Sequence, residues 1–168
     1  MRVISALVVA LGLGVSQARA GLVWQGTQLW FLVAGAYCVK EPDSYAPAPS
    51  VKSGWVGVDD QPYDFFTYGA VSAATDVGIG VQARLTDARP GEGMTFEITG
   101  PKDGVPDSWS RPLSADGNFW FGRKPEKGEA LDPGPYRFKV FRSGRLVLDY
   151  EVMVLAKRGP NPCEKPVS

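Results

Sequence analysis

Alternating apolar and polar positions dominate the middle of the chain. In residues 77–86, VGIGVQARLT, every second side chain is apolar, whereas Gln82, Arg84 and Thr86 fall on the opposite face. Residues 94–99, MTFEIT, repeat this alternation. A period of two residues is typical of a strand with one buried face. We therefore predict two such strands, with core-facing side chains Val77, Ile79, Val81, Ala83 and Leu85 in the first and Met94, Phe96 and Ile98 in the second.

The last third of the chain predicts a β-hairpin. Residues 135–141, PYRFKVF, and 145–154, RLVLDYEVMV, both alternate, and Ser143-Gly144 lies between them. A two-residue turn at Ser143-Gly144 would pair Val140 with Val147 and Phe138 with Asp149, which mixes the apolar face of one strand with the polar face of the other. This mismatch argues against the short turn.

A three-residue loop at 142–144 restores the match between the two apolar faces. Gly144 would then supply the left-handed residue of the bulge that closes such loops. Opposite charges would also meet on the outer face, where such contacts contribute about a few tenths of a kcal/mol. The predicted register pairs Val140 with Leu146, Phe138 with Leu148, and Arg137 with Asp149.

Weaker strand patterns occupy residues 27–38, 53–59 and 117–122, and the first of these is apolar enough to predict burial on both faces. No long window of the remaining chain keeps a helical period. Together with the Pro- and Gly-rich turns, this spacing predicts an all-β fold, an antiparallel immunoglobulin-like β-sandwich of about seven to eight strands. An outer-membrane barrel of eight strands is the alternative at this length. The fourteen prolines, most of them in loops, and the lack of a terminal aromatic strand argue against it.

The N-terminus predicts export. Met1-Arg2 is a short positive region, residues 3–15 are apolar, and Ala18-Arg19-Ala20 has the small-residue pattern of a cleavage site. We interpret residues 1–20 as a removed signal peptide rather than a membrane anchor, 21–156 as one sandwich domain and 157–168 as an irregular tail. Without Arg2 and Arg19, 16 basic and 18 acidic residues remain, a balance that gives no electrostatic reason to expect nucleic acid or a membrane surface as the partner.

The two cysteines, Cys38 and Cys163, are expected to form a structural disulfide that ties the tail to the domain. In an oxidising compartment two lone cysteines most often pair. A redox or metal site is the competing interpretation, but the chain has no C-x-x-C motif and no histidine. Closing so long a loop would stabilise the fold by at most about 4 to 5 kcal/mol in the chain-entropy model.

The absence of histidine also excludes catalytic triads and histidine-based zinc sites. No S-x-x-K, Walker or dinucleotide motif is present after residue 20, and we expect no cofactor. Asp59, Asp60 and Asp64 lie beside aromatic residues and suit a glycosidase acid and base pair or a calcium ion. A solvated turn around Pro62 is the simpler interpretation of these three residues. Asp103 and Asp107 are weaker candidates for the same two kinds of site.

Aromatic residues give a further candidate site. In a small sandwich most of them belong to the core, but exposed ones would form a platform for sugar rings or a patch for another protein. Phe65 and Phe66 are adjacent, so one of them must face outward from a strand. The predicted contact surface comprises Trp55, Tyr63, Phe65, Phe66, Tyr68 and Trp109.

Several short segments resemble an uncharacterised family of secreted domains from alphaproteobacteria. They are GAYC and APAPSVKSGWV in residues 35–56, PYDFF at 62–66, VGIGVQARL at 77–85, and GPYRFKVFRSGRLVLDYEV at 134–152. The resemblance implies a secreted sandwich domain and attaches no activity or catalytic residue to it. At residues 97–104, EITGPKDG, this chain departs from the family, whose members carry a histidine-proline segment there.

From these observations we expect an exported, non-catalytic binding or structural module of the bacterial envelope, periplasmic or secreted and not embedded in the membrane. A protein or an envelope polymer is the expected partner, met through strand edges and loop aromatics. A carbohydrate-binding module is the alternative, a special case that exposure of Trp55, Tyr63 and Trp109 in one plane would distinguish. A histidine-free hydrolase would instead require its aspartates to converge in a pocket.

Overall fold

The computed structural model describes residues 21–26, 29–59, 62–68, 70–156 and 163. The predicted signal peptide and most of the predicted tail lie outside the described residues. Within the described part, no helix is long and apolar enough to cross a membrane. The strands are β1 (Gly21–Gln25), β2 (Leu29–Cys38), β3 (Ser44–Pro47), β4 (Trp55–Val58), β5 (Phe65–Tyr68), β6 (Val71–Ser72), β7 (Val77–Leu85), β8 (Gly93–Thr99), β9 (Asp107–Pro112), β10 (Asn118–Arg123), β11 (Gly134–Arg142) and β12 (Arg145–Leu155).

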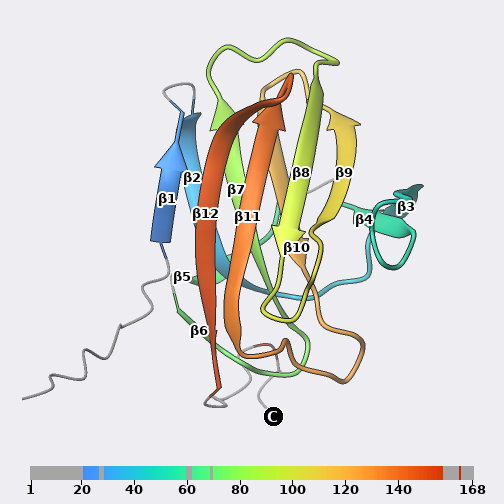
Figure 1. The fold of residues 1–168 in the computed structure, drawn as a ribbon, viewed down its shortest axis with the longest axis vertical. Helices are drawn as coiled ribbons and strands as arrows, with labels where there is room; N and C mark the ends of the chain where they lie inside the picture. Colours follow the sequence, from blue (N-terminus) through green and yellow to red (C-terminus); the bar gives the residue numbers. More distant parts are fainter. Residues whose placement is uncertain (1–20, 27–28, 60–61, 69, 157–162, 164–168) are drawn as a thin grey trace, which may run out of the picture.

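Two sheets pack face to face, and a separate hairpin projects from their side. The first sheet has the order β1-β12-β11-β8-β9, with β6 added in parallel to β12, and the second has the order β10-β7-β2-β5. Strands β3 and β4 pair only with each other. Figure 1 shows this hairpin beyond β9, on the side of the sandwich opposite β1.

The connections make the sandwich immunoglobulin-like. The chain changes sheet after β7, β9 and β10, so that β7 and β10 are neighbours in one sheet while β8, β11 and β12 are neighbours in the other. Strands B and E, and strands C, F and G, are divided in this way in the immunoglobulin fold. The predicted fold class is confirmed, and short strands of two to five residues, β1 and β3 to β6, raise the number of strands in the described residues to twelve.

The core lies between the two sheets, where the alternating pattern placed it. All eight predicted core-facing side chains of β7 and β8 are at most 3% exposed, and Tyr136, Phe138 and Val140 of β11 are buried with them. Burying one large apolar side chain stabilises the folded state by about 1.5 to 3 kcal/mol. The alternation therefore identifies the inner faces correctly because each strand has one side turned to the opposite sheet.

The predicted register of the β11–β12 hairpin is wrong. Ser143 and Gly144 both have positive φ, 49° and 75°, as a tight two-residue hairpin turn requires. A bulge follows, because Phe141 pairs with Leu146 whereas Val140 pairs with Leu148. Val147 is the extra residue, and it returns the apolar faces of the two strands to the same side. The two-residue turn therefore agrees with the apolar alternation of both strands, because the bulge shifts their register by one residue.

Arg137 and Asp149 nevertheless form the expected charge pair. Glu151, rather than Asp149, lies directly opposite Arg137. The guanidinium reaches Asp149 diagonally and donates two hydrogen bonds of 2.7 Å, from Nε and Nη2. The Asp149 residue is only 4% exposed, so this paired contact compensates for the burial of a carboxylate.

The disulfide between Cys38 and Cys163 is confirmed. Their Cα atoms lie 5.4 Å apart across a sequence separation of 125 residues, a distance at which two cysteines bond readily. Cys38 ends β2, so the bond fixes one residue of the C-terminal segment beside the second sheet. Such a bond is typical of proteins in an oxidising, exported environment.

Burial of β2 on both faces is confirmed only for its second half. Ala34, Gly35, Ala36 and Tyr37 are all buried, whereas Trp30 is 69% exposed. The neighbouring strand β7 is likewise buried on both faces from Val77 to Val81. Something other than the opposite sheet must therefore cover the outer face of the second sheet at this end.

Candidate ligand-binding cleft

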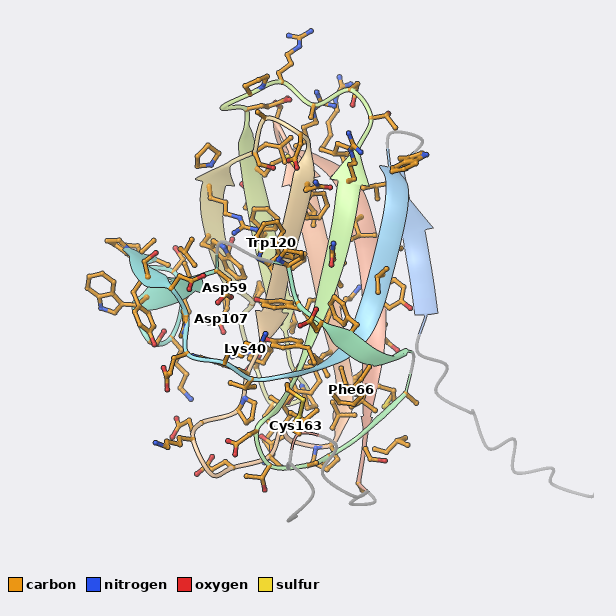
Figure 2. The ribbon with its side chains drawn as sticks, turned by 180° about the vertical axis from the view of Figure 1, so that it is seen from behind. Lys40, Asp59, Phe66, Asp107, Trp120 and Cys163 are labelled. Atoms are coloured by element: carbon orange, nitrogen blue, oxygen red, sulfur yellow. A yellow bond between two sulfur atoms is a disulfide. The ribbon has the colours of Figure 1, made fainter. Side chains whose placement is uncertain are left out.

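A cleft of about 1100 Å³ lies at the side of the sandwich, where β9 and β10 form the edges of the two sheets. Its other wall is formed by residues from the described parts of the next segment, 39–59 and 62–64, which carries the β3–β4 hairpin on this side. Figure 2 shows Asp59, Asp107 and Trp120 on the side from which the hairpin projects, away from Phe66. Ligand pockets commonly have volumes of about 300 to 1000 Å³, so the cleft is large enough for an extended ligand.

Three glycines leave space for an aromatic ring at the base of the cleft. Gly78 and Gly80 in β7 and Gly122 in β10 turn their missing side chains outward, and the Tyr37 ring lies across them. A Cβ atom at Gly78 would come within 2.6 Å of Tyr37 Cζ, and one at Gly122 within 2.7 Å of its hydroxyl oxygen. Glycine is required at these positions because the aromatic ring occupies the space of a side chain.

A second tyrosine, Tyr63, covers the first. The rings of Tyr37 and Tyr63 are parallel to within 4°, with centroids 3.9 Å apart, and Phe65 meets both rings edge-on. The Tyr37 hydroxyl donates a hydrogen bond to Tyr63, and the Tyr63 hydroxyl donates one to Asp59. A chain of hydrogen bonds thus runs from the buried sheet surface to a carboxylate that lines the cleft.

The positions of these groups shift their ionisation. Burial raises the pKa of Tyr63 to about 12 and that of Tyr37 well above its usual value, so both phenols remain neutral. Burial and, next, the charge of Asp43 raise the pKa of the Asp59 carboxyl. Lys124, the hydrogen bond from Tyr63 and the charge of Arg111 act in the opposite direction without cancelling this effect.

Strand β9 contributes the opposite wall. Asp107, Trp109 and Arg111 alternate along it and pair with core-facing residues of β8, so their side chains point into the open side of the sandwich. The Trp109 ring packs on Phe96 with centroids 5.9 Å apart. The inward charges of Asp107 and Arg111 also protect an edge strand from pairing with another chain.

Arg111 is held between aromatic rings. Its guanidinium carbon lies 4.9 Å from the centroid of Phe96 and 5.9 Å from that of Trp120, distances at which a cation is attracted by the ring face. Nη2 donates a hydrogen bond to the Trp120 carbonyl oxygen. Burial lowers the pKa of this guanidinium, while Tyr63 and Asp59 act to raise it.

An ion-pair network fixes the hairpin to the sandwich. Arg123 contacts Asp103 at 2.5 Å and Asp107 at 2.7 Å. The other oxygen of Asp107 accepts a hydrogen bond of 2.9 Å from the backbone N–H of Lys52, in the loop between β3 and β4. Asp103 and Asp107 were weaker candidates for an acid and base pair or a calcium site. Their partners show a structural role instead, because they link the two sheets and the hairpin.

Two buried donors beside the cleft lack a partner within the part of the chain that the structure describes. They are Nε1 of Trp120 and Nε of Arg123. Both residues line the cleft. A buried N–H group without an acceptor costs about 1 to 3 kcal/mol, and such groups are frequent at sites that bind water or a ligand.

The predicted contact surface is divided in the structure. Trp55 is 54% exposed and lines the cleft with the half-buried Tyr63 and Trp109. The three rings share a site, but only Trp55 is exposed, so they do not form a flat platform of three exposed rings. Phe65 packs against the tyrosines, and Phe66 is 41% exposed on the edge strand β5, as its adjacent position required. The side chain of Tyr68 lies outside the described part.

The aspartates do not all converge. Asp59 and Asp64 both line the cleft, but Asp59 is half-buried, whereas the Asp64 side chain is 92% exposed and lies 3.5 Å from Lys40. Asp60 is outside the described residues. Among the residues that the structure describes, no group of three acidic or cysteine side chains is placed to hold a metal ion.

Sequence reasoning missed Tyr37, Arg111 and Trp120, which carry much of the cleft. The alternation of Asp107, Trp109 and Arg111 within DSWSRP was visible and sets all three on one face of a strand. The alternation did not reveal whether this face points to the cleft or to solvent, because that depends on how the strand pairs with β8. The glycines of VGIG were equally visible, but nothing nearby in the sequence indicated the rings that cover them.

No protein-family model matches the sequence, and no curated protein matches it either. Among solved structures, an immunoglobulin-like protein from Pseudomonas aeruginosa is 16% identical, with a TM-score of 0.47, over 77% of this chain and 99% of that chain. A β-glucosidase from Listeria innocua in complex with glucose is 14% identical, with a TM-score of 0.30. That alignment covers 73% of this chain and 22% of the enzyme, so the chain spans about a fifth of the glucosidase. Both similarities are too distant to bear on ligand or activity.

Proposed function

We propose that this protein is an exported, non-catalytic binding module of the bacterial envelope, and that the cleft is its binding site. The observation that carries the proposal is the cleft itself, in which an aromatic-held guanidinium, a desolvated carboxylate and an exposed tryptophan face one large concave space. Ligand sites typically combine apolar walls with a few such convergent polar groups. A non-catalytic role is favoured because the Asp64 side chain is 92% exposed and lies beside Lys40, so it is not the desolvated second carboxyl that an acid and base pair would need.

Several features support export to the periplasm or beyond the cell. The disulfide suits an oxidising compartment, and the sequence pattern of residues 1–20 is that of a signal peptide. The partner we propose is a protein or an envelope polymer, because the cleft is open along one side of the domain and is large for a single small molecule.

The test compares two tryptophan variants of the full mature protein. Trp55→Ala removes an exposed ring from the cleft, and Trp30→Ala removes an exposed ring of the same kind from β2, outside the cleft lining. Each tagged protein is immobilised and exposed to the envelope fraction of the host cell, and the retained proteins and glycans are quantified by mass spectrometry. We expect Trp55→Ala to lose the retained partner and Trp30→Ala to keep it.

Circular dichroism on each variant confirms that it is folded. If both variants retain the same partner as the wild type in the same amount, the cleft is not the binding site. Retention that depends on Trp30 alone would place the contact on the outer face of the second sheet instead.

Phe66 tests the remaining part of the predicted contact surface. It is exposed on β5, an edge strand of the second sheet, where an extended segment of a partner would pair by β-augmentation. Phe66→Ala should leave the thermal unfolding temperature nearly unchanged. Loss of the partner in this variant, with retention in Trp55→Ala, would move the binding site from the cleft to this edge.

A further inference from the structure

Arg111 presents hydrogen-bond donors to the cleft in a fixed orientation. The rings of Phe96 and Trp120 limit its rotation, and one N–H group is used by the Trp120 carbonyl. In the described part of the chain this guanidinium makes no other hydrogen bond and no ion pair within 4.0 Å. Its remaining donors are therefore available to a ligand that enters the cleft.

Asp59 supplies a complementary acceptor. It lines the same cleft, is half-buried, and accepts the hydrogen bond at the end of the tyrosine chain. Asp59 and Arg111 influence one another electrostatically, yet these two described residues do not approach within ion-pair distance, 4.0 Å. A donor and an acceptor thus share one cleft without neutralising each other, which leaves room for a bridging group.

A sugar hydroxyl is such a group, because it donates one hydrogen bond and accepts others. A pair of neighbouring hydroxyls would donate to Asp59 and accept from Arg111, while the apolar face of the ring would stack on an exposed aromatic ring such as Trp55. We infer that the cleft binds a neutral oligosaccharide, held between Asp59 and Arg111 and stacked on Trp55. This inference rests on the proposed function and specifies its ligand class.

The charges around the cleft favour a neutral ligand over a polyanion or a polycation. Its lining contains seven carboxylate and six cationic side chains, so its net charge is close to zero. Several of these charges already have partners, among them Arg123 with Asp107 and Lys40 with Asp64. A strongly charged polymer would gain little net electrostatic attraction in this cleft. To bind tightly, it would have to break some of these ion pairs and replace one partner of each.

The probes are maltohexaose, cellohexaose, laminarihexaose and hexa-N-acetylchitohexaose, all neutral, titrated one at a time into the full mature protein. Tryptophan fluorescence gives the first readout, because Trp55, Trp109 and Trp120 all line the cleft, and calorimetry gives the affinity. We expect saturable binding of at least one hexasaccharide. Trp55→Ala and Asp59→Asn should each weaken it about tenfold, the first through lost stacking and the second through a lost charged acceptor.

Trp30→Ala is the matched control and should leave the affinity unchanged. The inference is overturned if none of the four probes binds at millimolar concentration, or if Trp55→Ala and Asp59→Asn bind the saccharide as tightly as the wild type does. Tighter binding of hexagalacturonate than of every neutral probe would overturn the choice of a neutral ligand. If the saccharides fail but Trp55→Ala still loses its envelope partner, the inference falls while the proposed function stands.

Discussion

On the inner face of β7, Val77, Ile79 and Val81 pack against the opposite sheet, and on its outer face Gly78 and Gly80 lie beneath the Tyr37 ring. All five residues are buried. The inner face is covered by another sheet and needs bulky apolar side chains. The outer face is covered by aromatic rings and needs no side chains at all.

The difference shows how one strand serves both stability and binding. The inner face contributes to a continuous core that would hold the sandwich together without the outer cover. The outer face supports the Tyr37–Tyr63 stack, and the stack positions Asp59 at the cleft. Substitutions on the inner face should therefore mainly lower the free energy of unfolding. Substitutions on the outer face should mainly disturb the arrangement of the residues that line the cleft.

The largest effect is expected for Ile79→Ala on the inner face. This residue is fully buried, and its truncation leaves a cavity in the core that costs about 3 kcal/mol. Urea unfolding followed by circular dichroism measures the loss. A cost below about 1 kcal/mol would mean that the inner face is not the main source of stability, and the contrast between the two faces would fail.

A smaller loss is expected for Gly80→Ala on the outer face. The added Cβ would lie 2.8 Å from the Phe121 carbonyl oxygen and 3.2 Å from atoms of Tyr37 and Tyr63. Such overpacking costs about 1 to 3 kcal/mol, and the near-ultraviolet circular dichroism of the tyrosines should change with it. Gly93→Ala is the control in β8, where a Cβ meets nothing within 4 Å. Equal stability of both variants would show that the rings do not rest on the strand.

Tyr63→Phe separates the ring stack from its hydrogen bonds. The phenyl ring preserves the stacking, but the buried Tyr37 hydroxyl loses its acceptor, at a cost of about 1 to 2 kcal/mol. Tyr45→Phe is the control, because the Tyr45 residue is exposed and its hydroxyl makes only a long contact of 3.5 Å with Glu41. Chemical denaturation should show a loss only for Tyr63→Phe. A neutral result there would mean that the hydrogen-bond chain does not organise the outer face.

The smallest effect is expected for Asp59→Asn, and it depends on pH. Because the folded-state pKa of Asp59 is raised, the folded protein binds this proton more tightly than the unfolded chain does, and the stability that Asp59 contributes is lost as pH rises through the folded pKa. The groups that face it are Asp43, Lys124, Tyr63 and Arg111. The variant should melt slightly above the wild type at about pH 7 and at nearly the same temperature at about pH 3. A variant that melts lower at pH 7 would contradict this sign.

The inner face could be predicted from sequence because alternation records which side of a strand avoids water. Ile79 and Phe138 needed no knowledge of their partners. The hairpin register was less accessible, since the bulge at Val147 is set by the fit between β11 and β12. The sequence Ser143-Gly144 is compatible with both the two-residue turn and the three-residue loop. Only the fit between the strands shows that both residues adopt positive φ in the two-residue turn.

The candidate site was predictable only in fragments. Trp55, Tyr63 and Trp109 were predicted to belong to a contact surface, and all three line the cleft. Their arrangement depends on the path of residues 39–64 across the side of the sandwich, which no local pattern encodes. Tyr37 lay inside an apolar run and was assigned to a strand without any sign that it turns outward.

We propose that a partner binds to the side of the domain formed by β9, β10 and the β3–β4 hairpin. This proposal can be tested by hydrogen–deuterium exchange of the protein, alone and with the solubilised envelope fraction of its host cell. We expect slower exchange in residues 51–59, 107–111 and 120–124 when the envelope is present, with β5 unchanged. Slower exchange confined to β5 or β1, with none around the cleft, would contradict it.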